Sequence, residues 1–397
     1  MSEKLDLGHR VTFGNSVGAL EAAEWDACAG TDNPFVSHAF LESLEKSGCV
    51  GEKTGWLPYP ALLRERPDGP LLGAAPCYIK LHSKGEYMFD YHWADAYHRL
   101  QPEEDSYYPK LQVAVPFTPV PGPRILVDRG LPVDLQKVVK RNLLQSIREQ
   151  ADKLQFSSAH VTFCQEDEVQ DAVASGDYLP RLGEQYHWFN DDYKTWDDFL
   201  VTLTSRKRKN IRKERERANS HPLEIVTLHG SEVTPEQLLR FYRMYQTTCM
   251  QKWGQPYLNL DFFQRLAQTL GDRLVLFLVR RTADGQWVAG AWNLRGDNAL
   301  FGRNWGCLEQ YDLLHFEVCY YRAIEYAIEH GLSRVEAGAQ GMHKIGRGYR
   351  PRPVHSVHYI RPLAFRTAIA QYLASETQEM EFRLEALAEL EPFKSSP

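Results

Sequence analysis

Polar side chains gather in one short stretch near the C-terminus, after the strand-like run Arg334–Ala337. This stretch carries Glu336, Gln340, His343 and Lys344, with Gly338 and Gly341 between them. General acid–base catalysis needs a group that takes a proton, and a developing negative charge needs hydrogen-bond donors. Glu336 or His343 can act as the base, and Lys344, Gln340 or a backbone N–H as the donor. A structural turn with Lys344 facing solvent is the competing interpretation, although glycine-hinged loops at strand ends favour a site.

The preceding strand and helix carry further candidates for substrate binding. Arg303 and Trp305 alternate with Gly302, Asn304 and Gly306, so both large side chains share one face of a strand, and the other face is nearly bare. A bare face lets a backbone or a ligand approach. We expect Arg303 to belong to the site, whereas Trp305 either lines it or packs. Other candidates on this side are Glu317, Tyr321, Lys252 and Trp253; Glu317 is alternatively a first-turn acid stabilised by the helix dipole, and Tyr321 a core residue.

A basic run crosses the middle of the chain. Residues 206–217 contain eight basic and two acidic residues in a chain of net charge −6. Ile211 is the only large apolar residue of the run, which predicts a surface helix. One interpretation is an anion site for tRNA phosphates or a nucleotide-bearing donor, and the other is a solvated helix with pairs such as Arg212–Glu216. The candidate phosphate ligands are Arg206, Arg208, Lys209, Arg212 and Lys213.

A second polar cluster lies among aromatic residues in the first half of the chain. Its members are His82, Glu86, Asp90, His92 and Asp95. Their spacing fits no standard metal motif, so we expect no metal. We expect a polar pocket for an acceptor molecule in a cleft between the two halves of the chain, with Lys110 and Arg124 among its neighbours. The sequence contains no Gly-x-Ser-x-Gly, Walker or dinucleotide-binding fingerprint.

The elements that position these residues follow from apolar periodicity. A strand at 300–307, a helix at 313–330 and a strand at 334–337 predict two parallel strands bridged by a helix, with ligands bound where the strands end. Helices are predicted at 20–29, 37–47, 135–154, 196–218, 234–251, 260–270 and 363–390. Strands are predicted at 87–93, 159–164, 223–228, 274–281 and 287–294. Both halves follow the order strand, two helices, antiparallel meander, helix and strand, and an acidic-aromatic join at 186–193 suggests a boundary near residue 190.

The totals bound the class of protein. A chain of 397 residues, 43% hydrophobic and 25% charged, is typical of two or three globular domains. Seven widely spaced cysteines indicate a reducing compartment, and the charged N-terminus does not resemble a secretory signal. The longest aliphatic run, 274–279, is too short to span a bilayer. We therefore expect a soluble cytoplasmic protein, and the sequence leaves its oligomeric state open.

The element order and several motifs resemble the FemAB-like family of tandem GNAT-fold proteins, which is related to the peptidoglycan aminoacyltransferases. The resemblance covers nearly the whole chain. Its motifs are Ser37–Leu41, Lys80–Tyr87, Tyr108–Leu111, Ser205–Arg215, Lys252–Gly254, Gly302–Gly306, His315–Glu317, Glu336–Gly341 and His343–Lys344. It implies a mixed α/β (α+β) fold of two GNAT-like domains, an acceptor-side domain at 1–190 and a donor-side domain at 191–397. Each domain would have a largely antiparallel sheet flanked by helices.

The family implies an acyltransferase that carries an acyl or aminoacyl group to an amine, linked to peptidoglycan or peptide-like precursors. One feature departs from a standard GNAT, where a glycine-rich turn holds the pyrophosphate of coenzyme A. The corresponding turn, Cys307–Leu314, has no glycine and two acids. This favours aminoacyl-tRNA over acyl-CoA as the co-substrate. An acyl-CoA-dependent N-acyltransferase, and a non-catalytic protein that binds RNA or a cell-wall precursor, remain alternatives.

Overall fold

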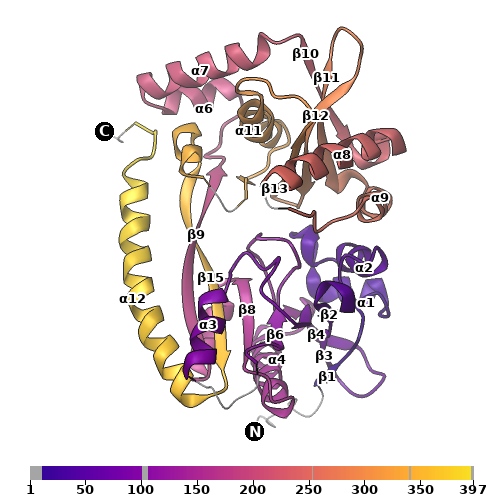
Figure 1. Cartoon of the computed structure of the whole chain (residues 1–397), viewed down its shortest axis with the longest axis vertical. Helices are drawn as coiled ribbons and strands as arrows, with labels where there is room; N and C mark the ends of the chain where they lie inside the picture. The colour runs from indigo at the N-terminus through magenta and orange to yellow at the C-terminus, as the bar shows by residue number, and fades with distance from the viewer. Residues whose placement is uncertain (1–10, 101–105, 253, 339–340, 395–397) are drawn as a thin grey trace. The chain divides into compact units, whose positions relative to one another are not determined.

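The computed structural model describes residues 11–100, 106–252, 254–338 and 341–394, and the chain forms two compact units (Figure 1). The N-terminal unit comprises residues 1–183 and 354–381, and the C-terminal unit comprises residues 184–353 and 382–397. Three elements contribute residues to both units: β9 (Leu179–Phe189), β15 (Arg350–Ile360) and α12 (Leu363–Ala388). The units follow contacts in space, so a linear division of the chain near residue 190 stays a prediction.

The N-terminal unit contains two sheets. The smaller sheet has the order β1 (Val11–Phe13), β3 (Ala61–Arg64), β4 (Leu71–Ala75) and β7 (Leu126–Val127). The strands of the larger run in the order β2 (Trp56–Pro58), β5 (Cys77–Lys80), β6 (Lys110–Val113), β8 (Ser158–Cys164) and β15. Strands β6 and β8 are parallel and are separated in sequence by α4 (Val133–Lys153), whose Leu143 and Ile147 are fully buried. The other helices are α1 (Ala22–Ala29), α2 (His38–Lys46), α3 (Tyr91–Leu100) and α5 (Glu166–Ala174).

The C-terminal unit repeats this plan along its own strands of the eleven-stranded sheet. The strand order is β10 (Leu223–His229), β11 (Leu274–Arg281), β12 (Trp287–Arg295), β13 (Ala299–Cys307), β14 (Arg334–Glu336) and β9. The first four strands are antiparallel, β13 and β14 are parallel, and β9 is antiparallel to β14. The predicted crossover helix is confirmed as α10 (Leu314–Phe316), a π-helical segment (Glu317–Tyr321) and α11 (Arg322–Glu329). The remaining helices are α6 (Trp196–Thr202), α7 (Ser205–Asn219), α8 (Pro235–Lys252) and α9 (Leu260–Thr269).

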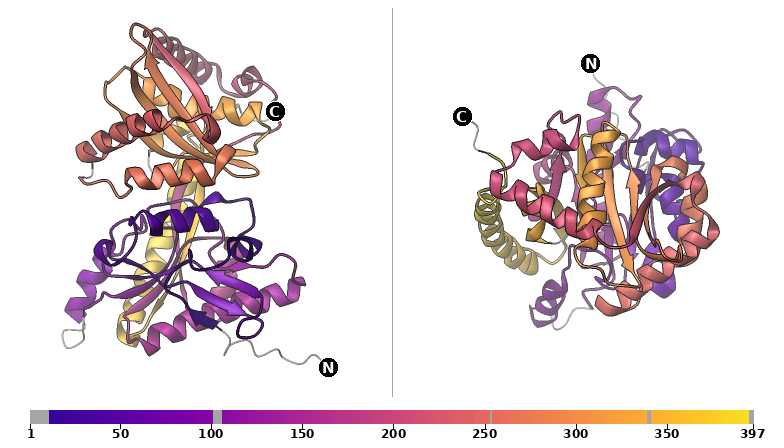
Figure 2. Two further views of the ribbon diagram at one scale, coloured as in Figure 1. Left: turned by 90° about the vertical axis from the view of Figure 1, so that its right-hand side faces the viewer. Right: turned by 90° about the horizontal axis from the view of Figure 1, so that it is seen from above.

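Helices cover both faces of the C-terminal sheet (Figure 2). On one face, Phe241 of α8 and Phe263 of α9 pack against the ring of Trp292 in β12. On the other face, Phe277 of β11 belongs to the same core cluster as Ile324 of α11. A strand buried on both faces needs a continuous apolar run, which explains the sequence Leu274–Val279.

Side-chain caps begin several helices where the sequence predicts them. The Ser37 hydroxyl accepts a hydrogen bond from the Phe40 amide at 3.3 Å, and α2 starts at the next residue. The Thr234 hydroxyl accepts from the Gln237 amide at the start of α8. Each cap satisfies an amide that the helix itself leaves without an acceptor.

The predicted strand at 87–93 is wrong. Tyr87 has a left-handed φ of 60°, and α3 begins at Tyr91. Trp93 and Tyr97 lie one helical turn apart and are both buried in one core cluster, a period that fits a helix and not a strand. Neither α5 nor β9 was predicted from the sequence. The first four residues of the expected join at 186–193 are the last four of β9.

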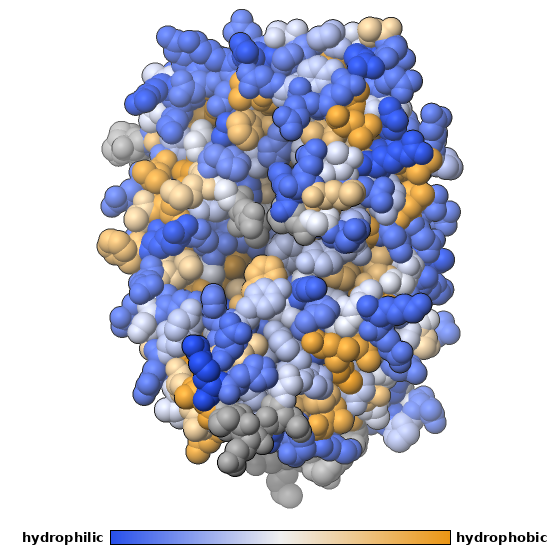
Figure 3. Space-filling view, viewed as in Figure 1, coloured by the Kyte–Doolittle hydropathy of each residue, from blue (hydrophilic) through white to orange (hydrophobic). Residues whose placement is uncertain are grey.

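The surface shown in Figure 3 is mostly hydrophilic, with scattered apolar patches. Among the described residues, no helix is both long enough and apolar enough to cross a membrane. All seven cysteines are free thiols, and five of them are buried.

Candidate functional site

The parallel strands of the C-terminal unit separate at a defined point. Strand β14 pairs with β13 only along Ala299–Phe301, and it ends at Glu336, opposite Phe301. Strand β13 continues to Cys307. One edge of β13 is therefore not paired with β14 beyond Phe301, and the loop after β14 starts beside this opening. Ligands in open α/β sheets bind at such strand ends.

Lys344 lies in the six-residue 3₁₀ turn Met342–Arg347 that follows this loop. Its side chain is buried, and its Nζ donates a hydrogen bond to the Gly338 carbonyl at 2.8 Å. The rings of Tyr186 and Tyr320 lie about 6 Å from the Nζ atom. No carboxylate among the described residues lies within ion-pair distance of Lys344. Burial lowers the pKa of Lys344 to about 7, so both of its protonation states are populated near neutral pH.

His343 precedes the lysine and contacts the π-helical segment. Its Nε2 atom lies 3.0 Å from the Tyr320 hydroxyl, and its ring lies 5.5 Å from the ring of Phe316. Burial, together with Arg347 and Lys344, lowers the pKa of His343, so the imidazole is neutral at pH 7. A Cβ atom on Gly341 would lie 2.3 Å from this ring, so glycine is required there.

Two further rings extend the cluster toward β13. His315 lies 5.4 Å from Tyr320 and 5.2 Å from Trp305 between ring centroids. Burial lowers the pKa of His315 to about 4, and the positive charges of Lys252 and Arg347, with that of Lys344 when protonated, contribute. The surroundings of His315 are therefore electropositive, and its own ring stays neutral. We name Trp305, His315, Tyr320, His343 and Lys344 the lysine cluster.

Glu336 occupies the end of β14 and is buried. Its Oε1 accepts a hydrogen bond from Arg334 Nε at 2.8 Å, and its Oε2 has no hydrogen-bond partner among the described residues. The imidazole of His187 lies beside it, with its Nε2 atom 3.8 Å from Oε2. A buried carboxylate oxygen without a donor is exceptional and calls for a functional explanation. Gln340, the remaining member of the predicted catalytic set, lies outside the described residues.

Of the two glycines in β13, Gly306 allows close packing of a helix and Gly302 does not need to be glycine for packing. A Cβ atom on Gly306 would lie 2.4 Å from the backbone carbon of Met244 in α8. The bare face at Gly306 therefore receives α8 and not a ligand. At Gly302 the same construction finds its nearest neighbours at 3.5 Å. Arg303 and Trp305 are half-buried; Lys252 is exposed at the end of α8, and Trp253 lies outside the described residues.

Glu317 and Tyr321 are used by the protein itself. The Glu317 carboxylate accepts three hydrogen bonds from Arg215, at 2.8 to 3.2 Å. The Tyr321 hydroxyl donates to Glu214 at 2.5 Å. Both residues belong to the π-helical segment, a geometry that is frequent at functional sites. Their contacts give them a role in holding this segment.

The basic run forms α7, with its charges distributed unequally. Arg206, Lys209, Arg212 and Lys213 are exposed, and Arg208 is half-buried. Ile211 and Ala218 are the buried residues of the helix. Arg212 lies 4.0 Å from Asp197, with both side chains more than half exposed, so this pair is weak. One side of α7 therefore presents cations to solvent.

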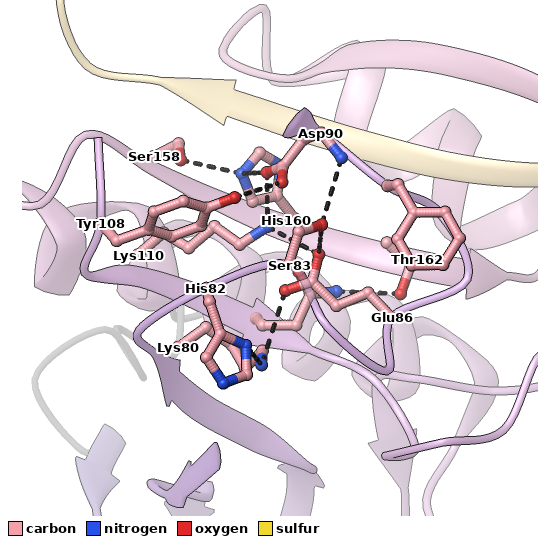
Figure 4. A network of polar contacts seen from close by, with 12 residues as sticks. Lys80, His82, Ser83, Glu86, Asp90, Tyr108, Lys110, Ser158, His160 and Thr162 are labelled. Atoms are coloured by element: carbon pink, nitrogen blue, oxygen red, sulfur yellow. Dashed lines mark hydrogen bonds and ion pairs between the residues drawn. The ribbon is translucent and has the colours of Figure 1, made fainter. Parts of the chain in front are cut away.

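The N-terminal unit contains a separate, buried polar network (Figure 4). Lys110 lies at its centre, and its Nζ donates to Glu86 at 2.8 Å and to Asp90 at 2.5 Å. The hydroxyls of Tyr107 and Tyr108 also donate to Asp90. The pKa of Asp90 falls because the charge of Lys110 and the hydrogen bonds from Lys110 and Tyr107 outweigh burial, whereas burial raises the pKa of Glu86. Because Glu86 and Asp90 lie in the loop between β5 and α3, these hydrogen bonds hold that loop against β6.

Two histidines and a second lysine extend this network. His160 and His358 face each other with their Nδ1 atoms 2.6 Å apart, so one ring donates and the other accepts. Burial lowers the pKa of both histidines well below the usual range. Lys80 Nζ lies 4.0 Å from Glu86 and 3.9 Å from the ring centroid of Trp56, and burial lowers the pKa of Lys80 to about 7.

The other predicted residues of this unit are placed apart or are used structurally. His92 is exposed to solvent on α3, apart from the buried network. His82 accepts a backbone hydrogen bond from Lys84 and lies 3.3 Å from Lys80 Nζ. Arg124 is fully buried and donates to the backbone carbonyls of Val120, Gly122, Pro123 and Thr162. No group of three potential metal ligands occurs among the described residues. A cavity of about 150 Å³ also lies in this unit, lined by Asn33, Arg129 and Gln165, and none of the network residues lines it.

Sequence reasoning missed several members of both clusters. Lys80, His160 and His358 are buried polar residues on strands, and their inward positions in otherwise apolar strands were the available signal. Glu214 and Arg347 hydrogen-bond to each other beside the lysine cluster, but no local pattern links them, because they are 133 residues apart.

The chain matches the FemAB_like family model, described as peptidoglycan biosynthesis/recognition, over residues 16–395. No curated protein matched the sequence. Among solved structures, FemX has a TM-score of 0.55 at 14% identity, covering 88% of this chain and 98% of FemX.

The C-terminal DUF2156 domain of a putative lysylphosphatidylglycerol synthetase from Agrobacterium fabrum has a TM-score of 0.52 at 10% identity, covering 90% and 96% of the two chains. L-PGS from Bacillus licheniformis has a TM-score of 0.50 at 10% identity, covering 86% and 97%. At these identities the structural likeness concerns the fold alone, and the predicted mixed α/β class is confirmed. Because the family match spans almost the whole sequence, this chain belongs to the FemAB-like family.

Proposed function

We propose that this protein transfers an acyl or aminoacyl group to an amine, with the chemistry at the lysine cluster of the C-terminal unit. The observation that carries the proposal is Lys344. It is buried, no carboxylate among the described residues pairs with it, and it follows the opening between β13 and β14. Burying an uncompensated ammonium is costly, so such a lysine indicates a functional demand.

The chemistry assigned to the cluster is direct transfer without a covalent enzyme intermediate. The acceptor nitrogen forms a bond to the donor carbonyl carbon, the carbonyl oxygen becomes an oxyanion, and the ester C–O bond then breaks. Lys344 in its ammonium form stabilises the oxyanion. His343, neutral at pH 7, takes the amine proton and then gives it to the departing alkoxide, which leaves as the alcohol. Glu336 is the second candidate for the base, because its Oε2 has no donor.

Aminoacyl-tRNA is the donor that we favour. The exposed cations of α7 suit a phosphate backbone. The turn before α10, where a GNAT would hold a pyrophosphate, carries Glu309 and Asp312, which pair with Arg281 and Arg217. Two carboxylates at this position disfavour a diphosphate. One structural relative is named as a domain of a putative lysylphosphatidylglycerol synthetase, and that name fits the transfer of an aminoacyl group.

An amine on a peptidoglycan precursor is the acceptor that we propose, from the description of the family. The experiment incubates the full chain with this acceptor and, in separate reactions, with a mixture of aminoacyl-tRNAs or of acyl-CoAs. Product is detected by mass spectrometry. We expect product with aminoacyl-tRNA alone, and no thermal stabilisation by coenzyme A.

The alternative function, binding without chemistry, predicts a different outcome. In that case no donor gives product, whereas Arg208→Gln with Arg212→Gln abolishes retention of RNA. Product from acyl-CoA, or stabilisation by coenzyme A, would instead contradict the donor assignment and leave the transferase assignment standing.

A further inference from the structure

Helix α7 has a second side, opposite its exposed cations. Glu214 and Arg215 are adjacent on the helix and are both half-buried. Glu214 contacts the turn that carries His343 and Lys344, and Arg215 contacts the π-helical segment that carries Tyr320. Each makes several charged hydrogen bonds.

Glu214 contacts the turn that carries His343 and Lys344. Arg347, the last residue of this turn, donates to the Glu214 carboxylate through Nε at 3.1 Å and Nη2 at 3.0 Å. Arg347 also donates through Nη1 to the His343 carbonyl at 2.7 Å, and its guanidinium lies 3.6 Å from the ring centroid of Phe316. The carboxylate of Glu214 thus holds the arginine that closes the turn.

Arg215 contacts the π-helical segment that carries Tyr320. Its guanidinium donates to Glu317 at 2.8 Å and to Glu325 at 2.6 Å, and it stacks over Trp196 at 4.5 Å. Tyr320 in turn lies within hydrogen-bond distance of His343. Two neighbouring residues of α7 therefore contact the two segments that carry Tyr320, His343 and Lys344, without hydrogen-bonding to these three residues themselves.

The turn itself needs external support. It is bounded by Gly341 and Gly348, with φ of 109° and 94°, which no other residue type adopts easily. Glycines at both ends give the turn little intrinsic stiffness. A site works only when surrounding contacts hold its reacting groups within a fraction of an ångström.

We propose that Glu214 and Arg215 are positioning residues: α7 fixes the turn of His343 and Lys344 through Arg347, and fixes the π-helical segment through Glu317. The inference rests on the proposed function, since it assigns the same helix to RNA binding on its opposite side. It implies that the basic helix joins the donor surface to the reacting groups.

The test measures the pH dependence with which a small acylating reagent labels Lys344, followed by peptide mass spectrometry. Glu214→Gln is compared with Glu216→Gln, which makes the same charge change at an exposed position of the same helix. We expect the wild type and Glu216→Gln to share a midpoint near pH 7. In Glu214→Gln the loosened turn hydrates Lys344, and the midpoint rises by about one pH unit or more. Identical midpoints in all three proteins would overturn the proposal.

A second variant covers the case in which Glu214→Gln does not fold. Arg347→Lys keeps the charge but loses the paired hydrogen bonds to Glu214, so it should shift the midpoint equally. The double variant should shift it no further than the single variant with the larger shift, because every one of them lacks the Glu214–Arg347 pair. Additive shifts would contradict the role of the Glu214–Arg347 pair in positioning the turn. The labelling experiment needs no turnover, so its failure and the failure of the transfer assay are separate results.

Discussion

At the scale of single residues, the proposed function depends most on Lys344. Among the described residues its Nζ donates a hydrogen bond to a backbone carbonyl alone, and burial lowers the pKa of Lys344 to about 7. A lysine in this state serves poorly as a structural residue and well as a group that exchanges a proton near neutrality. The sequence made it a candidate, because a polar residue on a glycine-bearing loop after a strand stands out against the apolar core, but it left open whether Lys344 faces solvent, and the structure buries it.

Lys344→Met should therefore stabilise the protein at pH 7, by roughly 1–3 kcal/mol. Folding lowers the pKa of Lys344, so the unfolded chain binds more protons between pH 7 and the ordinary lysine pKa, and wild-type stability rises with pH in that window. The gain from methionine should shrink as pH approaches 10. Urea unfolding at pH 7 and pH 9.5 measures both values. A loss of stability at pH 7 would contradict the uncompensated burial of the ammonium.

Lys110 is the opposite case, a buried lysine with two carboxylate partners. Lys110→Met should destabilise the protein by about 3–5 kcal/mol, because Glu86 and Asp90 would remain buried without their cation. Lys153→Met, at an exposed position of α4, is the matched control and should change stability by less than about 0.5 kcal/mol. Equal effects of the two substitutions in urea unfolding would refute the structural role of the network.

The partners of these residues escape prediction because they are distant in sequence. Glu214 and Arg347 are 133 residues apart, and His160 and His358 are 198 residues apart. Local spacing carries no information about such pairs. Composition showed that the residues were present, and only the folded chain shows which of them meet.

Strand β13 shows what can be read at the scale of elements. The alternation of glycine with large residues predicted one bare face, and the structure assigns that face at Gly306 to α8. The parallel pairing with β14 was predicted from the strand, helix and strand order and is confirmed. The helix α3 was mistaken for a strand because its aromatic residues have high β-propensity, whereas the burial of Trp93 and Tyr97 decided the outcome.

Gly306→Ala tests the packing of α8 on β13. The new Cβ would meet the Met244 backbone at 2.4 Å, so we expect a loss of about 1–3 kcal/mol. Gly302→Ala is the control on the same strand, where the nearest atoms lie at 3.5 Å. That substitution should be neutral or stabilising by up to about 1 kcal/mol, through reduced entropy of the unfolded chain. Thermal unfolding of both variants measures the difference, and equal losses would contradict this packing.

The basic side of α7 makes a prediction about RNA. Replacing Arg206, Lys209 and Lys213 with glutamine should lower the slope of log affinity against log salt concentration by about two to three. Replacing Lys53, Lys137 and Lys153, exposed lysines of the N-terminal unit, removes the same charge and should leave the slope nearly unchanged. Filter binding of a tRNA mixture from 50 to 200 mM salt provides the measurement. Equal slopes would refute α7 as the RNA surface.

At the scale of the whole molecule, the two units share one plan. In each, a parallel pair of strands is separated in sequence by a helix, β6 and β8 by α4, and β13 and β14 by α11. An additional antiparallel strand follows each pair, β15 beside β8 and β9 beside β14. The repeat of pattern and a last strand at 356–360, within β15, were visible in the sequence, but β9 was not predicted, because pairing with distant strands leaves no local signature. The units differ in their buried charges, which are paired around Lys110 and unpaired at Lys344.

The most direct test of the central claim is the single-turnover rate of aminoacyl transfer from tRNA to an amine-bearing peptidoglycan precursor. Wild-type protein, Lys344→Met and the control Lys153→Met are compared at pH 7 with protein in excess over donor. The account predicts equal rates for the wild type and Lys153→Met, and a rate at least about 100-fold lower for Lys344→Met. Transfer by Lys344→Met at the wild-type rate would contradict the assignment of the chemistry to this lysine.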